Sequence, residues 1–81
     1  MDETAIRENL RHYIARELIR DASYQIADDE GIITGGLMDS FALAELAVYI
    51  EQEFGVYIPN TDLTVAKMDS LNQIVDRVLR S

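Results

Sequence analysis

Residues 36–50 read Gly-Leu-Met-Asp-Ser-Phe-Ala-Leu-Ala-Glu-Leu-Ala-Val-Tyr-Ile, and the helix that they predict sets the architecture of the chain. Glycine residues lead into an Asp-Ser step, after which apolar residues recur at helical spacing. Aspartate and serine favour helix starts because their side-chain oxygens accept hydrogen bonds from free backbone amides. The pattern therefore predicts a helix from Asp39 or Ser40 to Phe54, with Gly55 as its C-terminal stop.

Both sides of this predicted helix carry apolar residues. The side expected to enter the core is formed by Leu43, Leu46, Ala47, Ile50 and Phe54. The opposite side is apolar near the helix start and acidic at its margins, which favours a docking surface for partner proteins. The predicted docking residues are Phe41, Ala44, Glu45, Val48 and Glu51. The alternative is that the long preceding loop covers Phe41 and Ala44.

Two further helices are predicted near the ends of the chain. Apolar residues recur at every fourth position over 6–18, which predicts a helix over about 4–20. A similar pattern predicts the last helix over 71–79. It follows Ser70, which forms with Gln73 the sequence pattern of a capping box, in which each side chain satisfies a free backbone amide of the other residue.

The connections between the helices differ in character. Segment 21–38 has no clean period and is rich in turn-forming residues, so a long loop is predicted there. Segment 60–68 is expected to hold one short helical turn. Apolar residues in these segments should reach the core, namely Ile26, Ile32, Ile33, Leu37, Leu63, Val65 and Met68. We therefore predict an all-α fold in one domain, residues 1–81: a small antiparallel bundle of three long helices and one short helix.

Composition restricts the classes of function. The chain has 81 residues, 48% of them hydrophobic, and no cysteine, which excludes disulfides and thiolate chemistry. Its formal net charge is −8, and nine acidic residues but no Lys or Arg lie within 21–66. This balance argues against nucleic-acid and anionic-membrane binding and favours basic partners. With no signal-peptide pattern and no apolar run of roughly 18–20 residues, we expect a soluble cytoplasmic monomer.

Ser40 is the candidate for chemistry. A serine nucleophile needs a positioned base, yet the one histidine, His12, is predicted on an exposed face of another helix. We therefore expect no enzyme activity in the chain itself. Ser40 could instead be a plain helix cap. The sequence repeats the Met-Asp-Ser-apolar pattern at Ser70, which has Gln73 as its reciprocal partner, whereas the equivalent position after Ser40 is Leu43.

The chain resembles acyl carrier proteins along nearly its whole length, most specifically over 36–75. The resemblance rests on the Asp-Ser-Phe step at 39–41, followed about one helix length later by Glu-Phe-Gly-Val-Tyr-Ile-Pro at 53–59. The commonest fatty-acid pattern has glycine three residues before the serine, where this chain has Leu37. Three stretches look more like aminoacyl, D-alanyl and specialised stand-alone carriers: Gly-Leu-Met-Asp-Ser-Phe at 36–41, Phe-Gly-Val at 54–56 and Met-Asp-Ser-Leu-Asn-Gln-Ile at 68–74.

The resemblance implies that Ser40 carries a covalent 4′-phosphopantetheine arm, through a phosphodiester, and that the arm holds an acyl or aminoacyl cargo as a thioester. It implies that Asp39 helps the modifying phosphopantetheinyl transferase (holo-protein synthase) to recognise the site. Further implied partners are a loading ligase and downstream transferases with basic docking surfaces, in fatty-acid, polyketide or nonribosomal-peptide synthesis. The alternative is an unmodified acidic adaptor in which Ser40 is only a helix N-cap.

Overall fold

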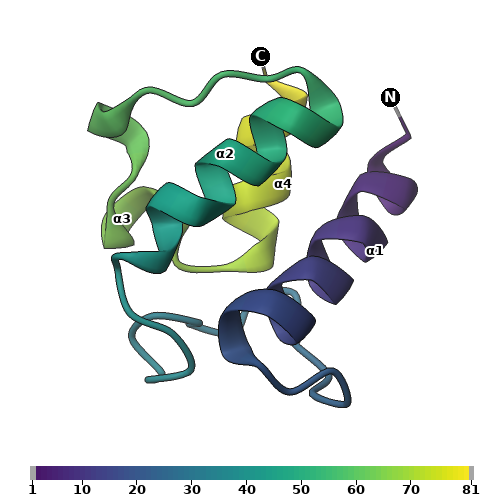
Figure 1. Cartoon of the computed structure of the whole chain (residues 1–81), viewed down its shortest axis with the longest axis vertical. Helices are drawn as coiled ribbons and strands as arrows, with labels where there is room; N and C mark the ends of the chain where they lie inside the picture. The colour runs from purple at the N-terminus through teal and green to yellow at the C-terminus, as the bar shows by residue number, and fades with distance from the viewer. Residues whose placement is uncertain (1, 81) are drawn as a thin grey trace.

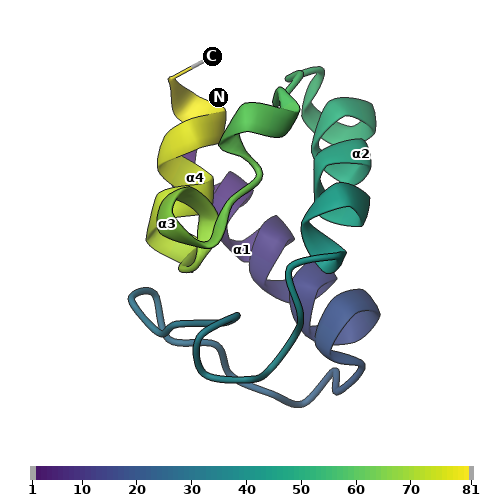
Figure 2. The ribbon, with the colours of Figure 1, turned by 90° about the vertical axis from the view of Figure 1, so that its left-hand side faces the viewer.

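Three longer helical segments pack around one core in the computed structural model, which describes residues 2–80 (Figure 1). They are α1, Glu3–Tyr13, extended by a π-helical segment η1, Ile14–Ile19; α2, Ala42–Phe54; and α4, Leu71–Leu79. Two short elements, the 3₁₀ turn η2, Asn60–Asp62, and the helix α3, Val65–Met68, lie between α2 and α4. Helix α1 runs opposite to α2 and α4 (Figures 1 and 2). No strand occurs within 2–80, which confirms the all-α prediction.

The first helix is not a uniform α-helix over 4–20. It begins after Asp2, whose carboxylate accepts a hydrogen bond from the Thr4 amide, and changes after Tyr13 into the wider π-helical η1. Arg20 ends it in the left-handed region, at φ 66° and ψ 36°. Because the wider turn shifts the register of side chains, the fourth-position pattern fails at Leu18, which is half-buried rather than in the core.

The core takes residues from every longer helix and from the connections between them. Its fully buried large side chains are Leu10, Ile14, Ile26, Ile32, Leu43, Leu46, Ile50, Met68, Leu71, Ile74, Val75 and Val78. The predicted loop contacts are confirmed for Ile26 and Ile32, while Ile33, Leu37 and Leu63 pack against the core from its edge. Val65 is half-buried.

The chain from α2 to α4 is extended and then turns twice. Gly55 ends α2 with φ 71°, a backbone conformation that glycine adopts without strain. One short helical turn was predicted in this region, and the structure has two, η2 and α3. The predicted capping box of Ser70 and Gln73 is present at the start of α4. Leu79, the last residue of α4, is 39% exposed.

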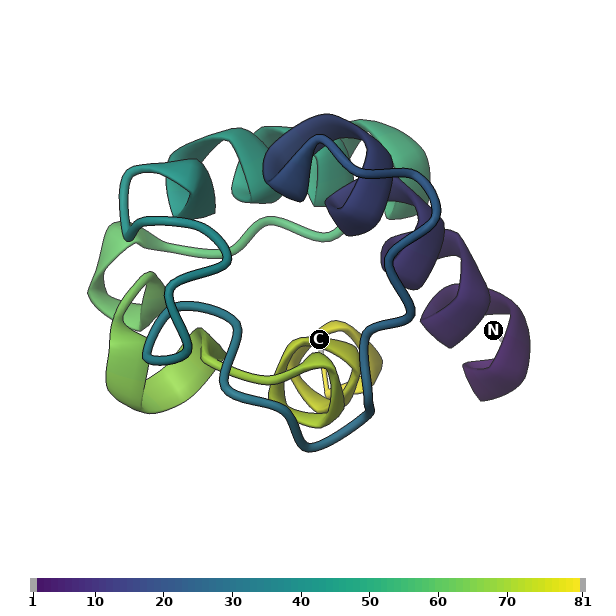
Figure 3. The same cartoon turned by 90° about the horizontal axis from the view of Figure 1, so that it is seen from below.

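The long loop between η1 and α2 crosses the lower end of the bundle (Figure 3). Asp69, which lies just before α4, holds the second half of this loop in place. The Asp69 carboxylate accepts hydrogen bonds from the Ile33 amide (2.8 Å), the Thr34 amide (3.0 Å) and the Thr34 hydroxyl (2.7 Å). Its backbone carbonyl accepts from the Ile32 amide at 2.7 Å. Burial alone would raise the pKa of Asp69, but these hydrogen bonds stabilise the ionised form and lower it.

Asp28 fastens the first half of the same loop. Its carboxylate pairs with Arg11 at 2.7 Å and Arg7 at 3.4 Å, and the hydrogen bond from Arg11 is the main reason why the pKa of Asp28 is lowered. Its backbone carbonyl accepts a hydrogen bond from the Asn72 amide at the start of α4, at 2.9 Å. The loop that leads to Ser40 is thus tied to both α1 and α4.

Candidate functional site

Ser40 lies on an exposed turn immediately before α2. Three hydrogen bonds of the tighter 3₁₀ type, each 3.2 Å long, form this turn: they run from the amides of Ala42, Leu43 and Ala44 to the carbonyls of Asp39, Ser40 and Phe41. The regular α-helix consequently begins at Ala42, two residues after Ser40, rather than at Asp39 or Ser40 as predicted.

The cap at this helix start is Asp39 and not Ser40. The Asp39 carboxylate accepts a hydrogen bond from the Ala42 amide at 3.2 Å. Within residues 2–80 the Ser40 hydroxyl makes no hydrogen bond, and no side chain caps α2 from the adjoining position 41. The interpretation of Ser40 as a helix N-cap is therefore wrong. Ser70 differs, because its hydroxyl accepts from the Gln73 amide at 3.2 Å and is committed to the capping box.

The predicted docking residues form one exposed surface, which we call the outer face of α2. Its members are Phe41, Ala44, Glu45, Val48 and Glu51, all of them exposed. Phe41 is 85% exposed and Val48 56% exposed, which is unusual for large apolar side chains in a small domain. The alternative that the long loop covers Phe41 and Ala44 is wrong, since the loop passes beneath the bundle (Figure 3).

Two shallow hollows flank Glu45 on this surface, of about 250 Å³ and about 350 Å³. The smaller one lies next to the site and is lined by Glu17, Leu18, Arg20, Asp39, Phe41, Ala42 and Glu45. The sequence analysis did not identify Glu17, Leu18 or Arg20 as neighbours of the site. Their position depends on the π-helical turn of η1 and on the left-handed Arg20, which the periodic pattern does not show.

The larger hollow lies where α1 and α2 are held together by aromatic packing. Tyr13 and Tyr49 stack with ring centroids 3.7 Å apart, and the Tyr49 hydroxyl hydrogen-bonds to the side chain of Asn9. Both tyrosines line the hollow together with Glu45, Val48 and Gln52. Burial raises the pKa of the Tyr49 hydroxyl. The outer face of α2 therefore lies beside the aromatic contact that joins α1 to α2.

His12 lies elsewhere. It is exposed, as predicted, and lines a separate small hollow with Glu8, Arg11 and Tyr24. Among residues 2–80 no three His, Cys, Asp or Glu side chains are grouped as metal ligands would be. No helix in the same range is long and apolar enough to cross a membrane.

Comparison with known proteins identifies a family and two relatives. Residues 9–78 match the phosphopantetheine attachment site family. The chain is 31% identical over 65 residues to a D-alanyl carrier protein of Bacillus velezensis, an alignment that covers 80% of this chain and 83% of that protein. It is 34% identical over 50 residues to a D-alanyl carrier protein of Lactobacillus helveticus, covering 62% of this chain and 63% of that protein.

Proposed function

The chain belongs to the phosphopantetheine attachment site family, and on that premise we propose that Ser40 carries the 4′-phosphopantetheine arm of a stand-alone carrier protein. The observation that supports this assignment is the free Ser40 hydroxyl, exposed at the start of α2 while Asp39 takes over the cap. Ser70 makes a poor alternative because its hydroxyl is needed to start α4.

The residues around Ser40 suit a phosphodiester. Within residues 2–80 the backbone amides of Ser40 and Phe41 have no hydrogen-bond acceptor, so both can donate to an anion. The N-terminus of α2 favours negative charge there. The Asp39 carboxylate, which its hydrogen bond to the Ala42 amide holds at the same helix start, would repel the phosphate, so we assign Asp39 to recognition by the phosphopantetheinyl transferase and not to binding the phosphodiester. When bound, the arm supplies a terminal thiol that can hold cargo as a thioester.

We infer that the cargo is an aminoacyl group, and D-alanyl is the first choice. Both relatives named above are D-alanyl carrier proteins. The hollow beside the site supports the same choice. Its lining holds three carboxylates, of Glu17, Asp39 and Glu45, against the one guanidinium of Arg20. Within residues 2–80 only Glu17 among these carboxylates is already in an ion pair, with Arg16. The remaining negative charge would attract the ammonium group of an aminoacyl cargo more than a hydrocarbon chain. The chain itself catalyses no step in this proposal. A ligase loads the cargo, and transferases remove it.

The outer face of α2 is the proposed docking surface for those enzymes and for the phosphopantetheinyl transferase. Phe41, Ala44 and Val48 offer exposed apolar contacts, and Glu45 and Glu51 offer negative charge to basic surfaces. Charge attraction of this kind raises association rates without requiring tight binding, which suits a shuttle that visits several enzymes. We expect the carrier to act as a monomer in the cytoplasm.

Attachment is tested by incubating the protein with coenzyme A and a broad-specificity phosphopantetheinyl transferase, followed by intact mass measurement. Wild type should gain one phosphopantetheine group, Ser40→Ala should gain none, and Ser70→Ala should be modified like wild type. An increment that persists in Ser40→Ala would refute the assignment. Protein that is modified as expected but loads only fatty-acyl groups, and never an amino acid, would retain the carrier function and contradict the proposed cargo.

A further inference from the structure

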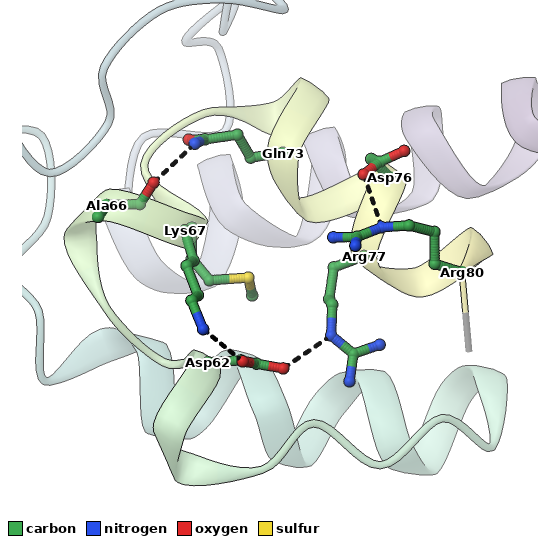
Figure 4. A pocket seen from close by; sticks show the side chains of 8 residues that line it. Asp62, Ala66, Lys67, Gln73, Asp76, Arg77 and Arg80 are labelled. Carbon is green, nitrogen blue, oxygen red and sulfur yellow. Dashed lines mark hydrogen bonds and ion pairs between the residues drawn. The ribbon is translucent and has the colours of Figure 1, made fainter.

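A further hollow of different character lies between η2, α3 and α4 and has a volume of about 360 Å³. Figure 4 shows its side chains: Lys67 comes from α3, Arg77 comes from α4, and Arg80 follows the end of α4. In a chain with seven basic residues and a net charge of −8, three of the seven line this one hollow. In Figure 2, α3 and α4 lie on the opposite side of the molecule from α2.

Two of these cations share one carboxylate. Asp62 accepts from Lys67 Nζ at 2.9 Å and from Arg77 Nε at 3.0 Å, and the two side chains converge on it from α3 and α4 (Figure 4). Their hydrogen bonds, that of Lys67 most strongly, lower the pKa of Asp62. The triad fastens η2 to the two helices. The single carboxylate of Asp62 neutralises only one of the two cations, so the triad of Asp62, Lys67 and Arg77 carries a net positive charge.

The hydrogen-bond donors of Arg77 are also in surplus. A guanidinium has five N–H groups, and only the one on Nε is used by Asp62. Within residues 2–80 no acceptor is recorded for the Nη groups of Arg77, although its side chain is only 20% exposed. Arg80, the residue after α4, pairs through Nε with Asp76 at 2.8 Å, which likewise leaves its Nη groups available. Both arginines therefore have Nη–H donors that are unused and lie at the same hollow.

From this arrangement we propose that the hollow is a binding site for an oxyanion, a phosphate or carboxylate group, held mainly by Arg77 with Arg80 and Lys67 beside it. Planar guanidinium groups match two oxygens of such a group at once, and a partly buried cation with unused donors gains most from the contact. The volume exceeds that of a phosphate ion and leaves room for a small phosphorylated or carboxylated molecule. The site is independent of Ser40.

The anion could come from a free small molecule or from a lipid headgroup, and the charge of the chain favours the free molecule. A net charge of −8 opposes approach to an anionic bilayer, whereas a small ion is affected mainly by the local cations. The test therefore uses two probes: inorganic phosphate in solution, and vesicles of anionic phospholipid with zwitterionic vesicles as the reference.

In the first arm, NMR signals of the arginine Nε–H groups and of the amides of α4 are followed while inorganic phosphate replaces chloride at constant ionic strength. We expect saturable shifts centred on Arg77 and Arg80. Arg77→Gln should weaken binding about tenfold. Since that change also loosens the Asp62 triad, Arg80→Gln is the second variant: its ion pair is mostly exposed, so it should fold normally and still bind more weakly.

Arg16→Gln is the matched control, because Arg16 forms a similarly exposed pair with Glu17 outside the hollow and should leave phosphate binding unchanged. Ser40→Ala should also bind phosphate like wild type.

In the second arm, cosedimentation with anionic vesicles that is lost in Arg80→Gln would assign the anion to a headgroup. Shifts with phosphate but no cosedimentation would assign it to a free molecule. Non-saturating shifts that chloride reproduces, or equal shifts in Arg80→Gln and Arg16→Gln, would overturn the proposal.

Discussion

Replacing Asp69 by alanine removes the side chain that fastens the loop before Ser40. Its carboxylate accepts three hydrogen bonds, two from backbone amides and one from the Thr34 hydroxyl, at 2.7–3.0 Å. A hydrogen bond to a charged group contributes about 1.5–3 kcal/mol. Because the three bonds share one half-exposed group and water can replace part of each, we expect a total loss of about 2–3 kcal/mol. That corresponds to a drop in Tm on the order of 10–20 °C for a domain of this size.

The assay combines denaturant unfolding with amide hydrogen exchange. The Ile33 and Thr34 amides donate to the Asp69 carboxylate and should lose protection in Asp69→Ala. The Ile32 amide donates to the Asp69 backbone carbonyl, which the substitution leaves in place, so it is an internal control and should fall only with global stability. Modification of Ser40 by a phosphopantetheinyl transferase should slow at the same time, since the loop then orders only on binding.

Gly31→Ala tests the same loop contact without removing the carboxylate. A Cβ at position 31 would lie 2.2 Å from the Thr34 hydroxyl oxygen and 3.0 Å from an Asp69 carboxylate oxygen, so Thr34 would have to turn away from Asp69. We expect it to lower Thr34 amide protection as well. The reasoning would be refuted if Asp69→Ala cost less than about 0.5 kcal/mol, the range of an ordinary surface substitution, and left the Ile33 and Thr34 exchange rates unchanged.

Further predictions concern acid stability, the two serines and the docking surface. The pKa values of Asp69 and Asp28 are lowered in the folded state. The stabilisation from these carboxylates is therefore present above the pKa of an unfolded aspartate, about 3.9, and is lost as pH falls through the folded-state pKa values. Urea titrations should show the free energy of unfolding declining below about pH 4. Ser70→Ala should cost about 1 kcal/mol because it removes a helix cap, whereas Ser40→Ala should change stability by less than about 0.5 kcal/mol in the same unfolding assay. Glu45→Lys should slow modification by the transferase at low salt, and the difference from wild type should shrink as salt screens the charge; equal rates at low salt would contradict the docking surface.

The sequence was sufficient where one local rule determines the structure. Apolar spacing located α2 and α4. Gly55 marked the C-terminal end of α2, and the Ser70 capping box marked the start of α4. It also placed Val48 on an exposed side, because its position on a helix follows directly from the spacing once α2 is assigned.

The details that depend on long-range contacts could not be read in this way. The π-helical η1 buries both Ile14 and Ala15, and a regular fourth-position period gives no sign of this change in the helix. The order of the loop depends on Asp69, which lies 35 and 36 positions away from the residues it binds. The assignment of the α2 cap to Asp39 rather than Ser40 depends on a 3₁₀ first turn, since both residue types suit the position equally well.

The most direct test of the central claim is the location of the arm in protein purified from its own host. Trypsin cannot cut between Arg20 and Lys67, so residues 21–67, with Ser23 and Ser40, form one peptide, while Ser70 falls in the next. We predict phosphopantetheine on the 21–67 peptide, and fragmentation should place it on Ser40. A peptide found only unmodified, in protein that an active transferase also leaves unchanged, or an arm located on Ser23 or Ser70, would contradict the account.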